Sequence, residues 1–494
     1  MKKIFKAAKK VSLATVTFMV IGALRSKFMA MTIGPGGVGI FSQAAQFFQL
    51  AATFASLCIQ LGVTRYIANY HAQKDTERVQ SVIAVSFLMP LAVCAVFVAL
   101  AAGFRNAIGE LLFSTDRYNT LIAIAAFGVP FTVLAGMSET ILVGFGNYKF
   151  FAKGRRESII LSFVLLVICV KMFHLQGGFL YLLLGGILSF YVFFFRYLVP
   201  SAPRNFIFDA LRLKRSLAGS YRKIAKEFLS YSGIAFVTTI LNLFVVVFLR
   251  SLVIRHFGPE GNGIYQVVFA LSAYYLPFFT NGIWTYFYPK VSSLRERSKQ
   301  FSVEVNHALR FCALGMVPVV IALFLVRTLF VRLIFSSDFL AADRLFSTQL
   351  FGDMFYLAFY VLGTSLLATK RLRMYLIVGI ANSACLILSY LLLREPFGLK
   401  AMTIAYLATN ALSAAVVLGY HVIRMRMTIY VRNLILLPSA IGLAGASLFF
   451  WRGHILEIPV KAALCLAWIA VSFTKVERRR VIRYAMRHAA EFRS

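Results

Sequence analysis

The sequence predicts an all-α polytopic membrane protein, with two pseudo-symmetric six-helix lobes around a central cavity and two extra C-terminal helices. Three observations lead to this prediction: an apolar composition, long apolar runs and an internal repeat. Hydrophobic residues make up 60% of the 494 residues and charged residues only 14%, whereas soluble proteins have roughly 45–50% apolar and about 25% charged residues. An apolar content this high would fill roughly fourteen membrane spans of about 20 residues each.

Apolar runs bounded by charged residues and by Gly or Pro clusters mark the individual spans. The runs are continuously apolar, which indicates membrane helices and excludes the alternating pattern of a membrane β-barrel. The first run follows five lysines but is too long for the apolar part of a signal peptide, so it counts as a span. The expected spans are 11–33, 37–64, 81–103, 119–145, 157–174, 178–199, 231–256, 261–288, 307–328, 346–369, 374–393, 399–422, 434–450 and 456–474.

The positive charge of the chain marks its topology. There are 52 Lys and Arg residues against 18 Asp and Glu, a net charge of +34, which indicates a partner that is either a nucleic acid or a membrane surface. With the N-terminus in the cytoplasm, the inside segments hold 35 basic residues and the outside segments about 9. This bias follows the positive-inside rule and predicts a multi-pass protein with both termini cytoplasmic. We expect no nucleic-acid partner.

An internal repeat relates the two halves of the chain. The Gly-Pro-rich segment 34–41 recurs as 258–265, and the same offset of 224 residues relates 127–131 to 351–355. Each half then holds six spans that begin on the inside, so the two lobes would be related by an axis along the membrane normal. Such an arrangement favours a transporter whose lobes rock about a central site, and it argues against an enzyme. The Gly-rich segment follows no strand, so it indicates a tight hairpin and not a phosphate loop.

The repeat sets the predicted domain organisation. The connection 201–230 has apolar residues spaced by three and four with Arg and Lys between them, the pattern of an amphipathic helix lying on an anionic leaflet. The predicted domains are an N-terminal lobe 1–200, the cytoplasmic amphipathic linker 201–230, a C-terminal lobe 231–425, spans thirteen and fourteen within 426–474, and a basic cytoplasmic tail 475–494.

Polar residues follow helical spacing in two spans. In the second span they lie three or four residues apart over 43–64, as on one face of a continuous helix. Lipid cannot satisfy these groups, so the face either makes hydrogen bonds between helices or lines a wet cavity, and the length of the stripe favours the cavity. The predicted cavity-lining residues are Gln43, Gln46, Gln49, Thr53, Ser56 and Gln60 in the second span, and Gln349, Tyr356 and Tyr360 in the tenth.

Five ionisable residues lie deep within the expected spans, where an unpaired charge is costly and therefore a functional candidate. They are Arg25, Lys27, Arg250, Glu139 and Asp353. Arg25 and Lys27 are two residues apart, about 200° around a helix, so they cannot both face the cavity. Cations outnumber anions in this set. The pathway is therefore predicted to be electropositive, which suits an anionic ligand such as a phosphate.

Three segments resemble Wzx-type flippases of the multidrug/oligosaccharidyl-lipid/polysaccharide exporter superfamily. They are the hairpin 34–41, the segment 62–71 that closes the second span, and Gln349–Asp353 in the tenth. The sequence is most similar to the O-antigen and the enterobacterial common antigen lipid III flippases. The resemblance covers roughly residues 1–425. Lys27 matches a lysine in the family's first span and Arg65 its basic residue before a tyrosine, whereas Arg25 is not clearly part of the pattern.

The resemblance implies movement of an undecaprenyl-pyrophosphate-linked oligosaccharide across the bacterial inner membrane by alternating access, for O-antigen-like surface polysaccharide. Arg25, Lys27 and Arg250 are then the candidate pyrophosphate contacts, and Asp353 and Glu139 the candidate counter-ions or coupling groups. Besides the substrate and membrane lipids, a polysaccharide polymerase, a chain-length regulator and a coupling proton or sodium ion are candidate partners. No cofactor, metal site or catalytic residue is expected.

Two alternatives remain open. A cation-coupled multidrug exporter of the same fold would need acidic residues deep in the N-terminal lobe, where Glu139 stands alone. An integral-membrane glycan polymerase, ligase or glycosyltransferase would show acidic residues on a sizeable outer loop, and the longest outer loops, near 104–118 and 329–345, are short.

Overall fold

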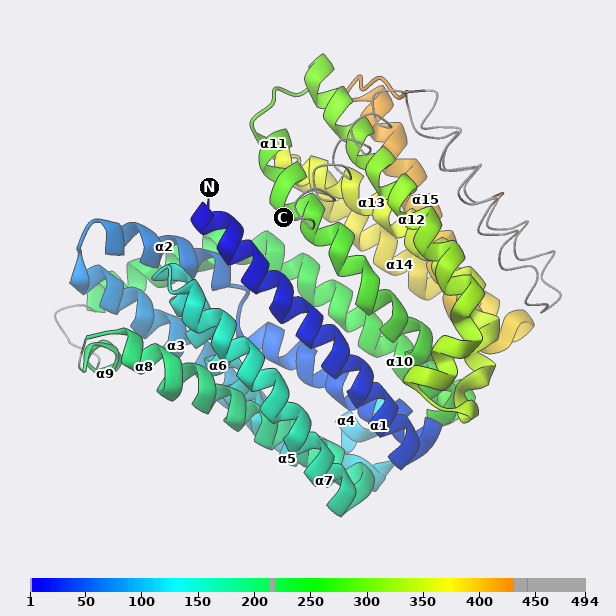
Figure 1. Cartoon of the computed structure of the whole chain (residues 1–494), viewed down its shortest axis with the longest axis horizontal. Coiled ribbons are helices and arrows are strands. Elements are labelled where there is room, and N and C mark those ends of the chain that lie inside the picture. The colour runs from blue at the N-terminus through cyan, green and yellow to red at the C-terminus, as the bar shows by residue number, and fades with distance from the viewer. Residues whose placement is uncertain (1, 204, 213–217, 431–441, 443–494) are drawn as a thin grey trace, which may run out of the picture. The chain divides into compact units, whose positions relative to one another are not determined.

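The computed structural model describes residues 2–203, 205–212, 218–430 and 442. Within these ranges the chain forms helices joined by short turns and contains no strand, which confirms the predicted all-α class (Figure 1). The expected spans 434–450 and 456–474, apart from residue 442, and the tail 475–494 lie outside the described residues. The count of fourteen spans therefore stays a prediction.

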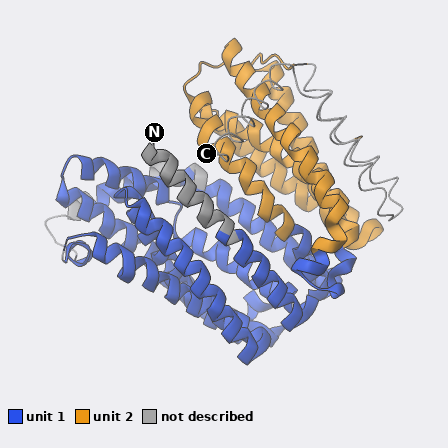
Figure 2. Ribbon diagram, viewed as in Figure 1, with its two compact units in different colours: residues 1–269, 331–342 blue, residues 270–330, 343–494 orange. Residues whose placement is uncertain are grey.

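The chain divides into two compact units (Figure 2). Unit 1 holds residues 1–269 and 331–342, and unit 2 holds residues 270–330 and 343–494. These units follow packing and not the repeat, so they do not test the predicted lobe boundaries at 200 and 231.

Helices cover all six expected spans of the first half. The second span continues into a separate short helix, and the connection before the fourth span contains a short helix and a 3-10 turn, η1 (Asp116–Tyr118). The helices are α1 (Lys2–Ala55), α2 (Gln60–Ala72), α3 (Thr76–Gly103), α4 (Arg105–Phe113), α5 (Asn119–Ala126), α6 (Gly128–Gly144) and α7 (Tyr148–Phe190), followed by η2 (Tyr191–Leu198), α8 (Val199–Ser201) and α9 (Phe206–Leu211).

The second half repeats this arrangement of long helices. Its helices are α10 (Ala218–Gly282), the π-helical turn η4 (Ile283–Phe287), α11 (Tyr288–Ser292), α12 (Lys299–Ile334), η5 (Ser337–Ala342), α13 (Asp343–Ala368), α14 (Leu372–Phe397), η6 (Gly398–Lys400) and α15 (Ala401–Ile423). All six expected spans between 231 and 422 are therefore helical.

Three of these helices are far longer than a bilayer is thick. α1 has 54 residues, α7 has 43 and α10 has 65, whereas about 20 residues cross the hydrocarbon core. Each contains one residue with non-helical backbone angles: Gly34 in α1, His174 in α7 and Gly258 in α10. These breaks fall at the boundaries expected between spans one and two, five and six, and seven and eight.

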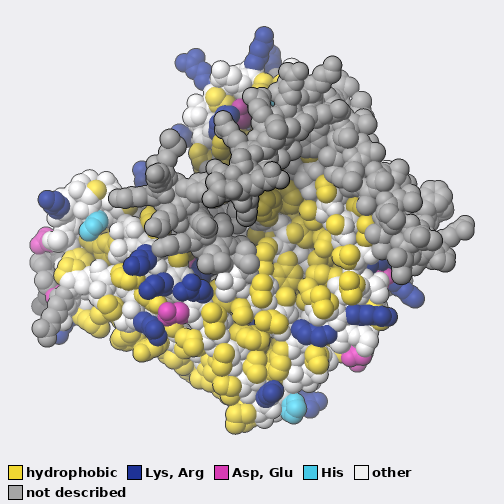
Figure 3. Space-filling view, in the orientation of Figure 1, with side chains coloured by type: hydrophobic (Ala, Val, Ile, Leu, Met, Phe, Trp, Pro, Cys, Tyr) yellow, Lys and Arg dark blue, Asp and Glu magenta, His cyan; other side chains and the backbone are white. Residues whose placement is uncertain are grey.

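Seven described helical segments are long and apolar enough to cross a membrane, or eight if the pair α1 and α2, bent by 43°, counts as one. The stretches 148–201, 236–292 and 372–423 each contain two expected spans. Exposed hydrophobic side chains, among them Met31, Met172 and Leu392, form broad areas with groups of Lys and Arg around them (Figure 3). This surface is typical of a protein embedded in lipid.

The two Gly-Pro-rich segments have the same backbone conformation. Gly34 has φ 64° and ψ −175°, and Gly258 has φ 71° and ψ 175°, a region that residues with a side chain rarely adopt. Within unit 1 the segments also pack reciprocally. A Cβ on Gly39 would clash with the carbonyl oxygen of Pro259, and a Cβ on Gly263 with that of Pro35. Gly39 and Gly263 are 224 residues apart, and so are Pro35 and Pro259. The two copies of the repeated segment therefore share one conformation and make equivalent contacts here.

We expect Gly39→Ala and Gly263→Ala each to lower the free energy of unfolding by about 1–3 kcal/mol, because the added methyl group meets backbone that cannot rotate away. Gly36→Ala is the matched control, since its Cβ would lie 3.6 Å from Glu260 Cγ, an ordinary contact. Thermal melting of the purified protein in detergent measures all three. Equal melting temperatures for the three variants would contradict the close approach.

The linker packs on unit 1. Ile207 and Ala210 in α9, and Ile224 and Phe228 at the start of α10, belong to the buried core of this unit, while Lys223 is exposed. These apolar residues of the predicted linker therefore pack within unit 1, and the place of the linker on a leaflet stays a prediction. The core of unit 1 offers an apolar surface close by, where Gly62 leaves room for the ring of Phe228.

The ends of several unit 2 helices are tied together by polar contacts. Arg371, between α13 and α14, donates to Glu296 Oε2 at 2.7 Å and to the hydroxyl of Tyr420 at 2.8 Å. The hydrogen bond to Glu296 raises the pKa of this guanidinium above its ordinary value. Arg297 also donates to the carbonyl oxygen of Arg424. These contacts fix the turn 293–298 against the ends of α13 and α15.

Candidate functional site

Unit 1 contains a buried polar cluster where α1 packs against α10. Its members come from the second half of α1 and from both sides of the Gly258 break in α10. We call it the Arg250 cluster, and it consists of Ser42, Gln43, Arg250, Ser251, Asn262 and Gln266.

Arg250 is completely buried at the centre of this cluster. Its guanidinium donates from Nη1 to Ser42 Oγ at 3.0 Å and from Nη2 to Gln266 Oε1 at 2.6 Å. It lies over the ring of Phe269, 4.6 Å from the centroid, and 5.4 Å from that of Tyr265. Arg250 pairs with no carboxylate among the described residues. Neutral acceptors and aromatic rings compensate such a charge in part.

The amides of the cluster join the two helices. Gln43 Nε2 donates to Ser251 Oγ at 2.8 Å and to the carbonyl oxygen of Val247 at 3.1 Å. Asn262 Nδ2 donates to the carbonyl oxygen of Gly39 at 2.8 Å, beside the reciprocal Gly-Pro packing. Three buried atoms of the cluster, Gln43 Oε1, Asn262 Oδ1 and Arg250 Nε, have no hydrogen-bond partner among the described residues. Because buried polar atoms are normally paired, this cluster has spare hydrogen-bonding capacity.

Arg25 and Lys27 face different surroundings, as their spacing predicts. Arg25 is exposed, and no described residue forms a hydrogen bond or ion pair with it. Lys27 Nζ donates to the carbonyl oxygens of Arg332 at 2.8 Å and Phe335 at 2.7 Å. These carbonyls lie at the C-terminus of α12, where a cation is favourable. In this conformation Lys27 therefore caps a helix within unit 1.

The polar stripe of the second span does not lie on one continuous helix. α1 ends at Ala55 and α2 begins at Gln60, and Leu57 and Cys58 between them have positive φ angles. Gln43 and Ser56 are buried, Gln46, Thr53 and Gln60 are half-buried, and Gln49 is exposed and donates to Thr53 Oγ1. The prediction of one uninterrupted face is wrong, because the break rotates Gln60 relative to the residues before it.

Chemical labelling distinguishes these positions. We expect a cysteine at Gln49 to react readily with a water-soluble thiol reagent and a cysteine at Gln43 to react about tenfold more slowly or worse, because Gln43 has no exposed surface. The unmodified protein gives the background from its native cysteines. Equal labelling of both positions would show that the Arg250 cluster is open to water.

Unit 2 contains a second buried polar cluster around Asp353 of α13. Asp353 Oδ2 accepts from Ser272 Oγ at 2.6 Å and from the hydroxyl of Tyr275, both on α10. Oδ1 accepts from the hydroxyl of Tyr406 at 3.0 Å and from Gln349 Nε2 at 3.3 Å. Asp353 is fully buried, and no described Lys, Arg or His pairs with it. Four neutral donors therefore hold this carboxylate.

The remaining predicted residues lie apart from these two clusters or at their edge. Tyr356 and Tyr360 are half-buried, and the ring centroid of Tyr356 lies 5.9 Å from that of Tyr360 and 6.4 Å from that of Tyr406. In unit 1, Glu139 pairs with Arg155 of α7 at 3.5 Å. Glu139 is thus a counter-ion for a basic residue near the start of α7.

Sequence reasoning did not find most of the cluster members. The missed residues are Ser42, Ser251, Asn262 and Gln266 around Arg250, and Ser272, Tyr275 and Tyr406 around Asp353, none of which belongs to the polar stripes of the second and tenth spans. A polar residue within one span needs a polar partner in another span. Pairing the spans on this basis is the signal that could have found these residues.

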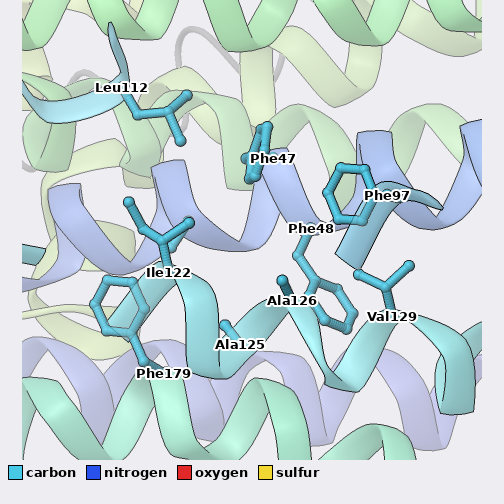
Figure 4. Close-up of a pocket in the computed structure, with 10 residues that line it drawn as sticks. Phe47, Phe48, Phe97, Leu112, Ile122, Ala125, Ala126, Val129 and Phe179 are labelled. Atoms are coloured by element: carbon cyan, nitrogen blue, oxygen red, sulfur yellow. The ribbon is translucent and has the colours of Figure 1, made fainter. Parts of the chain in front are cut away.

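A cavity in unit 1 contains none of the predicted polar residues. It is lined by Phe47, Phe97, Phe179 and other apolar side chains (Figure 4), and measures about 10 Å³. This is roughly the space of one water molecule. The cavity is therefore a packing defect between helices and too small for a substrate.

The fold and the two buried polar clusters define a helical membrane protein of the transporter class. The chain belongs to the polysaccharide biosynthesis protein family, whose sequence profile matches residues 47–343. It is 24% identical over 415 residues to the lipid III flippase of Escherichia coli (strain K12), covering 82% of this chain and 94% of that protein. The lipid III flippase of Shigella flexneri matches equally well.

Solved structures show the same fold. An inward-facing multidrug resistance MATE family transporter of the MOP superfamily superposes with a TM-score of 0.69 at 14% identity, covering 85% of this chain and 98% of that one. The lipid II flippase MurJ in an inward closed conformation gives 0.68 at 16%, covering 95% and 99%. Together with the family match, these relatives confirm the resemblance to Wzx-type flippases.

Proposed function

We propose that this protein is a flippase that moves an undecaprenyl-pyrophosphate-linked oligosaccharide from the cytoplasmic to the outer face of the bacterial inner membrane, for surface polysaccharide biosynthesis. The observation that carries the proposal is the match to the lipid III flippases, which extends over 94% of their length. Family membership over residues 47–343 and the fold shared with a lipid II flippase support it. A polymerase and a chain-length regulator would act on the glycan after it has crossed.

The proposed topology has both termini in the cytoplasm and six spans in each of two lobes, with two further spans after residue 425. The breaks at Gly34, His174 and Gly258 support this count, since each divides one long helix into two segments of membrane-crossing length. The matching angles and reciprocal packing of the Gly-Pro-rich segments support a two-fold relation between the lobes, because reciprocal contacts are the mark of a two-fold axis.

The proposed transport cycle opens the Arg250 cluster. Arg250 is buried with no acidic partner among the described residues, and the cluster has unfilled hydrogen-bonding atoms. Separating α1 from α10 would therefore give a guanidinium that is ready to bind a pyrophosphate. Lys27 would join it on leaving the end of α12, and the exposed Arg25 would guide the anion by charge. Gln46, Gln49, Thr53 and Gln60, with Tyr356 and Tyr360, have the amides, hydroxyls and rings that hold sugars.

Asp353 is the proposed coupling group. A buried carboxylate held by four neutral donors keeps its charge at a cost, and no Lys, Arg or His in the described part of the chain pairs with it. Binding and release of a proton or a sodium ion would therefore change its hydrogen bonds and the packing of α13 on α10. Glu139 has a fixed partner in Arg155 and acts as a structural counter-ion.

Reconstituted vesicles test the function. The full-length protein is reconstituted in liposomes that contain a lipid-linked oligosaccharide with a label on its glycan. If the protein moves this lipid, glycans on the inner leaflet reach the outer leaflet, where an added glycan-cleaving enzyme releases their label. We expect most of the label to become accessible with the protein and about half without it. The same result with and without protein would remove the proposal.

The alternative of a cation-coupled multidrug exporter is favoured by the fold shared with the MATE transporter. The same vesicles decide between the two, since an exporter would move a lipophilic cationic dye and leave the lipid-linked glycan in place. Asp353 could couple the transport of either a cationic drug or a lipid-linked glycan, whereas Arg250 favours the anionic glycan lipid.

A further inference from the structure

A polar hollow of about 620 Å³ lies at one end of unit 1, apart from both buried clusters. Three segments form it: the residues beside the Gly34 break of α1, the turn η1, and the break of α7. The residues that matter are Thr32, Arg117, Tyr118, Phe173, His174 and Gln176. In the proposed topology all three segments connect spans on the outer side. The volume is in the range of roughly 300–1,000 Å³ that small-molecule sites occupy.

The chemistry of the hollow is that of a site for an anionic sugar. Arg117, His174 and Gln176 are exposed, and no described Asp or Glu lines the hollow, although Asp116 directly precedes Arg117 in η1. A phosphate in the hollow would meet a guanidinium and an imidazole. The ring of Tyr118 stacks on Phe179 at 6.1 Å with an interplanar angle of 11°. This packing fixes the ring and leaves its face and hydroxyl to a ligand.

The hollow is apolar on one side. Met172 and Phe173 are 66% and 48% exposed, and they continue into the exposed hydrophobic residues of α7, such as Ile168. A site with an apolar side toward the lipid and cations toward water suits a headgroup whose chain remains in the bilayer. This arrangement fits the sugar-phosphate end of a lipid-linked glycan.

The backbone of His174 supplies an independent observation. His174 has φ 47° and ψ −126°, a conformation that costs a residue with a Cβ atom and that glycine adopts freely. The corresponding breaks in α1 and α10 both have glycine at the positive-φ position. In α7 the positive-φ position is occupied by His174, and the nearest glycine after it is Gly177. A Cβ on Gly177 would clash with the carbonyl oxygen of Cys169. A strained side chain facing a hollow indicates that the imidazole has a use there.

We propose that this hollow is an exit site that binds the sugar-phosphate end of the lipid-linked glycan on the outer face of the membrane. Arg117 and His174 contact the phosphate, Gln176 and Thr32 the sugar hydroxyls, and Phe173 and Tyr118 the sugar ring. The inference rests on the proposed function and topology. In the proposed cycle, this site would hold the headgroup after the Arg250 cluster has closed.

The probe for this site is N-acetylglucosamine 1-phosphate, with the full-length protein in nanodiscs of phosphatidylcholine. We expect binding that falls about tenfold or more in Arg117→Ala, because a charge-assisted hydrogen bond is lost. Arg105→Ala is the matched control, since Arg105 is exposed at the start of α4 and does not line the hollow. Neutral N-acetylglucosamine and inorganic phosphate are expected to bind at least tenfold more weakly than the sugar phosphate.

His174→Gly separates a ligand contact from a structural role. We expect it to raise the melting temperature, by about 1–2 °C, because the backbone strain is relieved, and at the same time to weaken binding of the probe. If His174 had only a structural role, the melting temperature would change while binding of the probe stayed the same, which would contradict the proposed contact.

Two results would overturn the exit site. One is equal binding of the probe by the Arg117→Ala and Arg105→Ala proteins. The other is binding of inorganic phosphate as tight as that of the sugar phosphate, which would assign the hollow to lipid phosphates. Failure of the proposed function looks different: the unmodified protein would then leave the lipid-linked glycan in place in vesicles, whatever the soluble probe does.

Discussion

Asp353→Asn is expected to reduce glycan transport by about tenfold or more while the protein stays folded, because the amide cannot exchange a proton or bind a cation as a carboxylate does. Asparagine has the same shape, and its oxygen can still accept from Tyr406. Its amide nitrogen can donate to the hydroxyls of Ser272 and Tyr275, which at present donate to the carboxylate. We therefore expect the free energy of unfolding to change by no more than about 1–2 kcal/mol. Transport in vesicles and thermal melting measure the two effects.

Glu395→Gln is the matched control for Asp353→Asn. It also replaces a carboxylate by an amide, but the side chain of Glu395 is 85% exposed near the end of α14, so transport should stay the same. Full transport by Asp353→Asn at normal membrane abundance would mean that the cluster is structural and that coupling lies elsewhere.

Much of the fold follows from the sequence, because lipid imposes simple rules on it. Long apolar runs can satisfy their backbone groups only as helices, so all twelve spans expected between 11 and 422 are helical. The Gly-Pro-rich repeat also predicts where α1 and α10 break. The turn at His174 shows the limit. Its span boundary was expected, but no sequence rule places a histidine at a positive φ angle.

The candidate site was predicted less well, because helical periodicity shows which residues share a face and not what that face meets. The stripe 43–64 was expected to line water, yet Gln43 is buried against α10 and the helix breaks before Gln60. The same limit applies to the linker, whose apolar residues Ile207 and Phe228 lie in the core of unit 1. Partners such as Gln266 and Tyr406 belong to no polar stripe, so they can be recognised as partners only when it is known which spans pack together.

Arg250→Met is expected to abolish binding of the pyrophosphate headgroup and so to stop transport, while the protein stays as stable as the unmodified chain or becomes more stable. Methionine fills much of the same volume, and it removes a buried charge that pairs with no carboxylate in the part of the chain that the structure describes. Replacing buried charges by apolar side chains of similar size is often neutral or stabilising by about 1–4 kcal/mol. Ser42 and Gln266 would lose a partner, which reduces that gain.

Arg250→Ala provides the contrast, since it removes the same charge but leaves a cavity beside Phe269. We expect it to lower the free energy of unfolding by several kcal/mol, on the order of 2–5, so transport alone could not separate misfolding from a lost contact. The pair of variants therefore distinguishes two roles of Arg250. If the guanidinium serves the substrate, the methionine protein is stable and inactive, whereas active methionine protein would mean that Arg250 fills space between α1 and α10. We expect the methionine protein to be stable and unable to move its substrate, because the guanidinium of Arg250 is buried in the present conformation and binds the substrate only when α1 separates from α10.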